Sequence, residues 1–364
     1  MRHGPGRAGG EFATPPESPA PASLPQRRSR WVRFQSAGYE LVAAYGLLGI
    51  LVALFLVFSI TMPDTFPTRF NIESMLSEQA VTALLALAVM LPMTVGQFDL
   101  SVGYFVGLAH ILTLGLQVQF GFPWPLACAT VLSSGVLLGI LNGWLITRVG
   151  IDSFIATLGT GTFVFGVASW YTGGRQILGT VQNGFYGIDT MIVGLLPSPT
   201  LCVVIIAVLL WILLEYRPIG RFFYAIGANP RAAELVGISP RRYIPWTFMG
   251  SGAITALAGI LLASELRVGQ TSVGPDYLLP AFTGALLGAT AIRPGRVNVW
   301  GTVVAVMLLA VIVSGLEQTG AQFFVAPLFN GLMLVTAVGL SIYTGRRRAR
   351  IAAAANRAES GSAR

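Results

Sequence analysis

Long stretches without a single charged residue recur along this 364-residue chain. They occupy residues 41–63, 79–98, 100–147, 153–174, 190–214, 243–264, 277–292, 297–316 and 318–345. A helix needs about 20 consecutive apolar residues to cross the hydrocarbon core of a bilayer. The run at residues 100–147 is long enough for two crossings, and Gly121, Pro123 and Pro125 interrupt it near its middle. The sequence therefore predicts an all-α integral membrane protein with about ten transmembrane helices.

The scarcity of charge supports this fold class. Charged residues make up 10% of the chain and hydrophobic residues 54%, whereas about a quarter of the residues in soluble domains are charged. So few charges cannot cover the surface of a soluble fold of this length. The composition therefore excludes a soluble enzyme.

The arginines divide unevenly between the two sides that ten spans define. One side collects both tails and most of the arginine-bearing loops. The opposite side holds Arg69, Arg175 and Arg267. Because loops rich in basic residues stay in the cytoplasm, we expect both termini of the chain to be cytoplasmic.

The two ends of the chain differ in composition from its middle. Residues 1–36 are rich in Pro, Gly, Ala, Ser and Arg without helical or strand periodicity, which predicts a disordered basic tail. Residues 346–364 are expected to form a second basic tail. The segment between them, residues 37–345, is predicted to be one transmembrane domain, whose longest inside loop covers residues 215–242.

Several kinds of chemistry are missing from the sequence. All 23 basic residues are arginines, and both a P-loop and a Schiff-base enzyme need a lysine. Any energy from ATP must then come from another protein. Cys128 and Cys202 lie in apolar runs, and no group of His, Cys and carboxylate residues has ligand spacing, so we predict no metal site.

The predicted helices contain almost no ionisable side chains. Proton-coupled and ion-coupled carriers keep such groups deep in their helices, because relays and ion sites use them. Catalysis inside the membrane would need a carboxylate pair or a Ser/His dyad, and none is present within the runs. An ion-coupled secondary carrier and a membrane-embedded enzyme are therefore disfavoured alternatives, and we predict no catalytic residue. The sequence therefore predicts a translocation pathway lined by neutral, weakly polar groups.

One Asp and one Ser stand among glycines between the second and third predicted spans, at residues 94–103. Two interpretations are open. Asp99 or Ser101 can cap the following helix by accepting a hydrogen bond from its first amides. Alternatively, both side chains line a translocation route.

The inside loop at residues 215–242 contains the signals of a short helix. Asn229 and Pro230 suit an N-cap and a first helical position, and Gly237 suits a stop. A solvated loop has no need of a short rigid helix bracketed by arginines. The two-turn helix predicted here is therefore a candidate docking element for a soluble partner.

These segments resemble the permease subunits of bacterial ABC importers for monosaccharides, of the ribose and xylose type. Residues 96–103, Gly-Gln-Phe-Asp-Leu-Ser-Val-Gly, are similar to that family's G-G-I-D-L-S-V-G. Residues 153–160 resemble its P-F-I-A-T-L-G-T, and residues 171–174 read Y-T-G-G as the family does. Residues 287–295 are like its G-G-T-S-L-x-G-G, with Arg293 and Pro294 as departures.

The inside loop carries the longest match, to the pattern G-R…A-x-G-G-N-x-x-A-A-x-x-x-G-I. The matching residues are Gly220, Arg221, Gly227, Asn229, Ala232, Ala233, Gly237 and Ile238. The resemblance implies a type II ABC importer permease fold in a bacterial cytoplasmic membrane. The implied cargo is a monosaccharide, with a nucleoside, a polyol or a signalling furanose as the alternative.

Site residues and partners follow from the same resemblance. The implied translocation pathway or gate uses Asp99, Ser101, Gly103, Thr157, Thr160 and Thr290. The implied ATPase-coupling loop uses Arg221, Gly227, Asn229, Pro230, Ala232, Ala233 and Gly237. The implied partners are a second permease subunit, identical or different, a cytoplasmic ABC ATPase that holds ATP and Mg, and an extracytoplasmic sugar-binding protein. The chain itself is expected to bind no cofactor and no nucleic acid.

Overall fold

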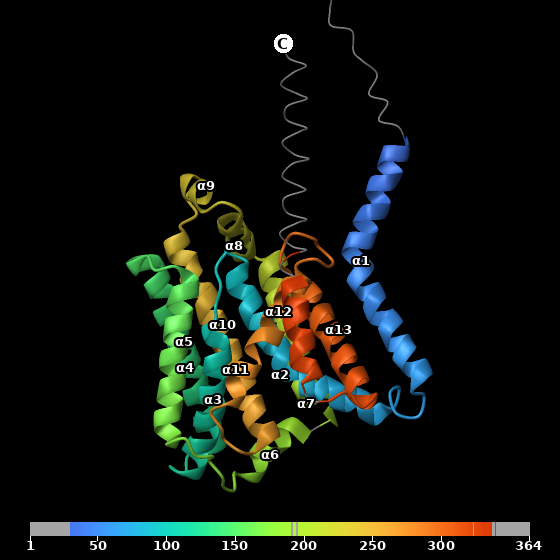
Figure 1. Cartoon of the computed structure of the whole chain (residues 1–364). Helices are drawn as coiled ribbons and strands as arrows, with labels where there is room; N and C mark the ends of the chain where they lie inside the picture. The colour runs from blue at the N-terminus through green and yellow to red at the C-terminus, as the bar shows by residue number, and fades with distance from the viewer. Residues whose placement is uncertain (1–29, 191, 194–195, 323, 337–338, 340–364) are drawn as a thin grey trace, which may run out of the picture. The chain divides into compact units, whose positions relative to one another are not determined.

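The computed structural model describes residues 30–190, 192–193, 196–322, 324–336 and 339 (Figure 1). The chain divides into two units, residues 1–39 and residues 40–364. Helix α1 (Arg30–Thr61) begins in the first unit. Residues 30–36 belong to this helix, and the basic tail predicted for residues 1–36 stays a prediction. The remainder of that tail, and the tail predicted for residues 346–364, lie outside the described residues.

The second unit is built almost entirely of helices. After the rest of α1 come α2 (Arg69–Met93), α3 (Ser101–Val118), α4 (Trp124–Trp144), α5 (Ser153–Thr172), α6 (Asn183–Thr190), α7 (Ser198–Trp211), α8 (Pro218–Ala228), α9 (Pro230–Leu235), α10 (Pro240–Leu266), α11 (Val273–Asp276), α12 (Leu278–Gly288) and α13 (Val299–Gln318). The π-helical turns η1 (Leu145–Val149) and η2 (Ile212–Tyr216) extend α4 and α7. Two short strands, β1 (Ile192–Val193) and β2 (Leu196–Pro197), pair antiparallel.

Seven of the described helices are long and apolar enough to cross a bilayer. They are α2, α3, α4 with η1, α5, α7 with η2, α10 and α13. Shorter apolar helices cover Tyr45–Thr61 and Val325–Thr336, and α12 has 11 residues. The all-α membrane fold is therefore confirmed. The count of about ten spans stays a prediction, because several predicted runs correspond to helices shorter than a full crossing.

The core of the second unit lies along α2 and α10. All residues of α2 from Ala80 to Pro92 are buried. Helix α10 packs on α4 through glycines: Gly135 lies against the backbone of Gly252, and Gly139 lies against that of Phe248, with no room for a side chain at either glycine. Small residues at four-residue spacing let helix backbones approach this closely.

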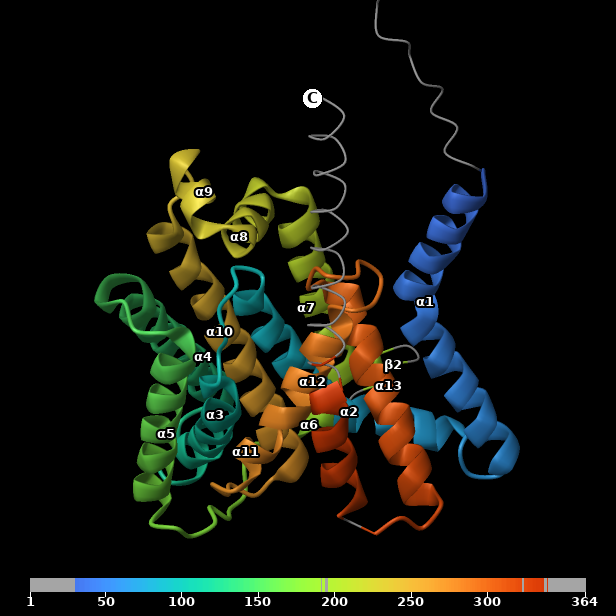
Figure 2. The ribbon, with the colours of Figure 1, turned by 45° about the horizontal axis from the view of Figure 1, so that its top comes forward.

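The chain leaves helical geometry between α2 and α3. Gly96 has a φ of 75°, and residues 97–100 are not helical. Figure 2 shows this segment descending from the end of α2 to the start of α3. We call residues 94–100 the α2–α3 junction. At that end of the bundle lie α8 and α9, whereas α6 lies near the other end (Figures 1 and 2).

Candidate functional site

A buried carboxylate ends the α2–α3 junction. Asp99 is 2% exposed. Its Oδ1 accepts hydrogen bonds from the Ser101 amide at 3.1 Å and from the Ser101 hydroxyl at 2.5 Å. Its Oδ2 accepts a 2.8 Å bond from the hydroxyl of Ser251 in α10. Asp99 therefore satisfies the first amide of α3, as a capping residue does, and also ties this helix to α10.

Ser101 extends the network to two more helices. The side-chain amide of Asn142 in α4 donates to Ser101 Oγ at 3.0 Å. The hydroxyl of Thr160 in α5 donates to Asn142 Oδ1 at 2.7 Å. Asn142 is fully buried, so both ends of its amide depend on these protein partners. The network thus joins α3, α4, α5 and α10 around one carboxylate.

Hydroxyls of α5 hold the junction in its non-helical form. The Phe98 amide donates to Ser153 Oγ at 3.2 Å, and the Leu100 amide donates to Thr157 Oγ1 at 3.0 Å. Non-helical backbone at membrane depth needs partners from neighbouring protein, because lipid offers none. Ser153 and Thr157 are one turn apart on α5, so the helix presents both hydroxyls to the same stretch of backbone.

The network is closed to solvent in this conformation. Asp99, Ser101 and Thr157 are at most 3% exposed. Such a cluster does not form the wall of an open channel. It is a sealed contact among four helices, and opening it would require the helices to separate.

Two residues expected at the pathway do not join this network. Gly103 lies against Leu278 of α12, where a side chain would not fit. The Thr290 hydroxyl donates to the Leu287 carbonyl at 2.7 Å, at the end of α12. Conversely, Asn142 and Ser251 belong to the network but were not singled out from the sequence. In the sequence, these two residues are marked by being polar residues within charge-free runs.

Helix α9 has the boundaries predicted for the short helix in the inside loop. Asn229 is its N-cap, whose side-chain oxygen accepts from the Ala232 amide at 3.1 Å, and Pro230 is its first residue. Gly237 follows with a φ of 85°, and its amide donates to the Glu234 carbonyl at 3.0 Å. The six residues of α9 come close to the two turns expected.

The outer face of α9 combines apolar and charged side chains. Leu235 is 89% exposed and Val236 is 74% exposed, beside the exposed Arg231 and Glu234. Ala233, in contrast, is buried against the rest of the loop. Neighbouring large apolar side chains exposed at a polar rim are typical of a protein-binding surface.

Helix α8 touches the α2–α3 junction through its backbone. Gly227 lies so close to the Thr94 carbonyl that a side chain would not fit there. Gly96 contacts Gly227 in turn, at an ordinary van der Waals distance. Arg221, also on α8, is exposed. The helix next to α9 is thus in direct contact with the segment that leads to Asp99.

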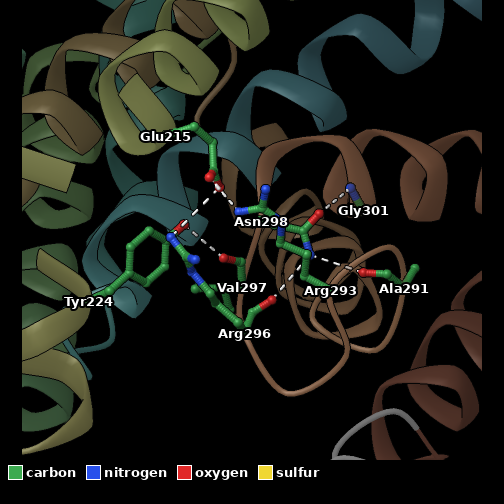
Figure 3. A network of polar contacts seen from close by, with 8 residues as sticks. All are labelled: Glu215, Tyr224, Ala291, Arg293, Arg296, Val297, Asn298 and Gly301. Carbon is green, nitrogen blue, oxygen red and sulfur yellow. Dashed lines mark hydrogen bonds and ion pairs between the residues drawn. The ribbon is translucent and has the colours of Figure 1, made fainter. Parts of the chain in front are cut away.

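A second set of contacts binds η2, through Glu215, and α8, through Tyr224, to the loop between α12 and α13 (Figure 3). Glu215 in η2 forms ion pairs with Arg293 and, at 3.6 Å, with Arg296. The guanidinium carbon of Arg296 lies 3.4 Å from the centroid of the Tyr224 ring. The Tyr224 hydroxyl donates to the Val297 carbonyl at 3.0 Å. We call Glu215, Tyr224, Arg293 and Arg296 the α8 clamp.

Two cavities lie near the far ends of α12 and α13, and the larger of them has a mainly polar lining. The larger, of about 170 Å³, is lined by Asn71, Glu78 and Gln79 of α2 and by Glu317 and Gln318 of α13. The smaller, of about 130 Å³, shares Gln79 and is lined also by Asp276, Tyr277 and Asn330. Carboxylates, amides and a phenol provide many hydrogen-bonding groups in a small volume. Among the described residues, no group of three or more His, Cys, Asp or Glu side chains could hold a metal ion.

The chain is similar to known transport proteins over most of its length. The family model described as branched-chain amino acid transport system / permease component matches residues 71–338. The ribose import permease protein RbsC of Bacillus subtilis is 34% identical over 80% of this chain and 90% of its own length. The autoinducer 2 import system permease protein LsrD of Klebsiella pneumoniae is 31% identical, over 80% and 89%. The D-allose transport system permease protein AlsC of Escherichia coli is 27% identical, over 81% and 90%. No solved structure matched the chain.

Proposed function

The chain belongs to the family of branched-chain amino acid transport system permease components, and from that premise we propose that it carries a monosaccharide through the membrane as a subunit of an ATP-driven importer. It is a multi-pass protein of the cytoplasmic membrane and a transport subunit, not an enzyme. The observation that carries the sugar assignment is its similarity to ribose and allose permeases over about four fifths of the chain. Similarity to the autoinducer 2 permeases makes that ligand the second candidate.

Helix α9 is the docking element for the ATPase in this proposal. The chain has no lysine for a P-loop, so ATP and Mg belong to a separate cytoplasmic subunit. The exposed Leu235 and Val236 provide apolar contact area, and the exposed Arg221 and Arg231 of the same loop are suited to acidic side chains on the partner. The small Ala232 allows close approach to the helix.

Movement of α9 reaches the gate through α8. Because Gly227 contacts the backbone of Thr94, displacement of α8 displaces the α2–α3 junction. The junction is held by hydrogen bonds to Ser153 and Thr157 and, through Asp99, to Ser251. Each of these contributes about 0.5–3 kcal/mol, with the bonds to the carboxylate at the upper end. A nucleotide-driven shift that breaks a few of them releases α3, α5 and α10 from one another.

The gate residues are therefore Asp99, Ser101, Thr157 and Thr160. Opening of their network would expose hydroxyl, amide and carboxylate groups to the pathway, which suits a neutral solute with many hydroxyls. Gly103 contributes by allowing α12 to approach α3 closely. Thr290, at the end of α12, lies outside this network, and its place in the pathway stays a prediction.

The remaining partners follow from the type of importer. A second permease subunit, identical or different, completes the pathway. An extracytoplasmic binding protein delivers the sugar. Arginines of the α8–α9 loop support a cytoplasmic location for that end of the bundle and for both termini.

The test uses the chain reconstituted in liposomes with an ABC ATPase and a sugar-binding protein from the genes that neighbour its own, where such genes are found. The binding protein is first screened by thermal shift against ribose, allose, xylose, a nucleoside panel and autoinducer 2. The ligand that raises its melting temperature identifies the cargo. We expect the loaded binding protein to stimulate ATP hydrolysis and uptake of that cargo. Uptake that continues with a hydrolysis-deficient ATPase would instead indicate an ion-coupled carrier.

A further inference from the structure

The α8 clamp is stronger than an isolated surface ion pair. Such a pair contributes about 0–1 kcal/mol. Here one carboxylate holds two guanidinium groups, and its side chain is only 18% exposed. The hydrogen bond to Glu215 raises the pKa of Arg293, so this arginine stays charged. Burial raises the pKa of Tyr224, so its hydroxyl remains a donor to Val297.

The loop that the clamp holds is itself rigid. The side-chain amide of Asn298 donates to the carbonyls of Gly288, Ala291 and Arg296 at 3.0–3.2 Å, and its oxygen accepts from the Gly301 amide at 2.8 Å. Asn298 thereby fixes the end of α12 and caps α13 together. A loop bound in this way transmits a displacement instead of absorbing it.

Backbone strain marks the same loop. Ile292, directly before Arg293, has a φ of 59°. A β-branched residue rarely adopts this left-handed conformation, which costs of order 1–3 kcal/mol. It persists only where surrounding contacts fix the backbone, and the clamp and Asn298 supply those contacts.

Helices α12 and α13 are packed too closely to slide freely. Gly288 lies against the backbone of Thr302, Gly301 lies against the Gly288 carbonyl, and Gly284 lies against Val306, with no room for a side chain at any of these glycines. Interlocked backbones of this kind move as one body. We call α12, α13 and the loop between them the hairpin.

The far ends of the hairpin line the two cavities. Glu317 and Gln318 of α13 border the larger cavity, and Tyr277 and Pro280, at the start of α12, border the smaller one. Gln79, from the buried α2, borders both on the opposite side. The width of both cavities therefore depends on the position of the hairpin relative to α2.

We propose that the α8 clamp makes the hairpin move together with α8 and with η2, on which α8 packs closely through Gly220 and the backbone of Leu214, so that nucleotide-driven movement at one end of the bundle changes the width of the two cavities at the other end. Glu215, Tyr224, Arg293 and Arg296 are positioning residues in this device. It rests on the proposed function, because α8 moves in this way only when α9 is docked on an ATPase. It differs from the path through Gly227, which ends at the Asp99 network.

The experiment measures cavity width without needing the cargo. Spin labels are placed at Phe70, at the start of α2, and at Thr319, just after α13, both of which are exposed. Their distance is measured in the full complex with the ATPase, first without nucleotide and then trapped with ATP and vanadate. We expect a shift on the order of 1–2 Å or larger, the usual size of helix shifts in switching proteins.

Glu215→Gln removes the negative charge that pairs with Arg293 and Arg296, with little change in the shape of the side chain. This variant should abolish the change in label distance. Arg296→Gln should do the same and guards against a folding defect of the first variant. The matched control is Glu73→Gln, which removes the exposed ion pair between Arg69 and Glu73. This control should keep the full shift.

Three outcomes would overturn the inference. The native complex could show no shift, or both clamp variants could keep it while still binding the ATPase. In either case the proposed function stands and the clamp has no transmitting role. An ATPase that does not co-purify with the native chain at all would refute the proposed function, and the inference with it.

Discussion

The Asp99 carboxylate accepts a 2.8 Å hydrogen bond from the hydroxyl of Ser251, 152 residues further along the chain. This contact joins the α2–α3 junction to the middle of α10. Both residues are almost completely buried. A buried carboxylate is costly unless hydrogen bonds satisfy it, so the contact both stabilises Asp99 and holds two helices together.

Asp99→Asn should weaken the closed gate without preventing assembly. Asn caps about as well as Asp, but hydrogen bonds to a neutral amide are about half as strong as those to a carboxylate. We expect the complex to form, ATP hydrolysis without binding protein to rise, and uptake per ATP to fall. Unchanged uptake and hydrolysis would show that Asp99 acts as a helix cap alone.

Ser251→Ala should destabilise the protein by about 1–3 kcal/mol, because Asp99 Oδ2 loses its donor inside the bundle. The matched control is Thr255→Val, since the Thr255 hydroxyl donates to the carbonyl of Ser251 in its own helix. Thermal unfolding in detergent measures both variants. Equal melting temperatures for the two variants would contradict the role assigned to the Ser251 hydroxyl.

Gly227→Ala should separate α8 from the α2–α3 junction, because the added methyl group would overlap the Thr94 carbonyl. We expect normal membrane insertion but a loss of ATP hydrolysis stimulated by the loaded binding protein. Gly166→Ala on α5 is the control, since nothing lies within 4 Å of a Cβ built there. Full stimulation of the Gly227 variant would remove α8 from the coupling path.

Gly237→Val should disturb the end of α9, because a β-branched residue at a φ of 85° costs at least about 1–2 kcal/mol. The exposed Leu235 and Val236 would then be presented differently to the ATPase. Stimulated hydrolysis and uptake should fall together, whereas Gly237→Asn should retain most of both, because Asn tolerates this conformation. If the valine variant transports normally, this loop is not the coupling element.

Cysteine labelling tests the orientation of the bundle. A cysteine at Ser239, exposed after α9, should react only with reagents that reach the cytoplasm. A cysteine at Thr319, exposed after α13, should react from outside. The reverse pattern would invert the topology deduced from the arginines.

Local signals in the sequence predicted local structure well. The boundaries of α9 follow from Asn229, Pro230 and Gly237, because capping and left-handed geometry involve only neighbouring residues. The composition of a short segment does not reveal where a long helix continues into it, so the sequence did not indicate that α1 begins at Arg30. The run at residues 277–292 predicted a helix where α12 lies, but an apolar run gives no measure of where a helix ends, so the shortness of α12 was not foreseen.

The partners of Ser101 and Asp99, which are Asn142 and Ser251, could not be predicted from the sequence for a different reason. Asn142 and Ser251 are isolated polar residues in apolar runs, and nothing in their own neighbourhood indicates which distant side chain they face. Burial in lipid makes a partner necessary, but the fold decides which one it is. The same holds for Glu215 and Arg293, which are 78 residues apart.

The hydroxyls that hold the α2–α3 junction have a consequence for synthesis. The Phe98 amide can form its hydrogen bond only after Ser153, 55 residues later, has been synthesised. The bond between Asp99 and Ser251 needs the synthesis of 152 further residues. At about 5–20 residues per second, the second delay lasts on the order of ten seconds. During that time, α3 has entered the membrane beside a stretch of backbone whose partners do not yet exist. The α2–α3 junction, which precedes α3 in the chain, is thus completed only after α10 has been inserted.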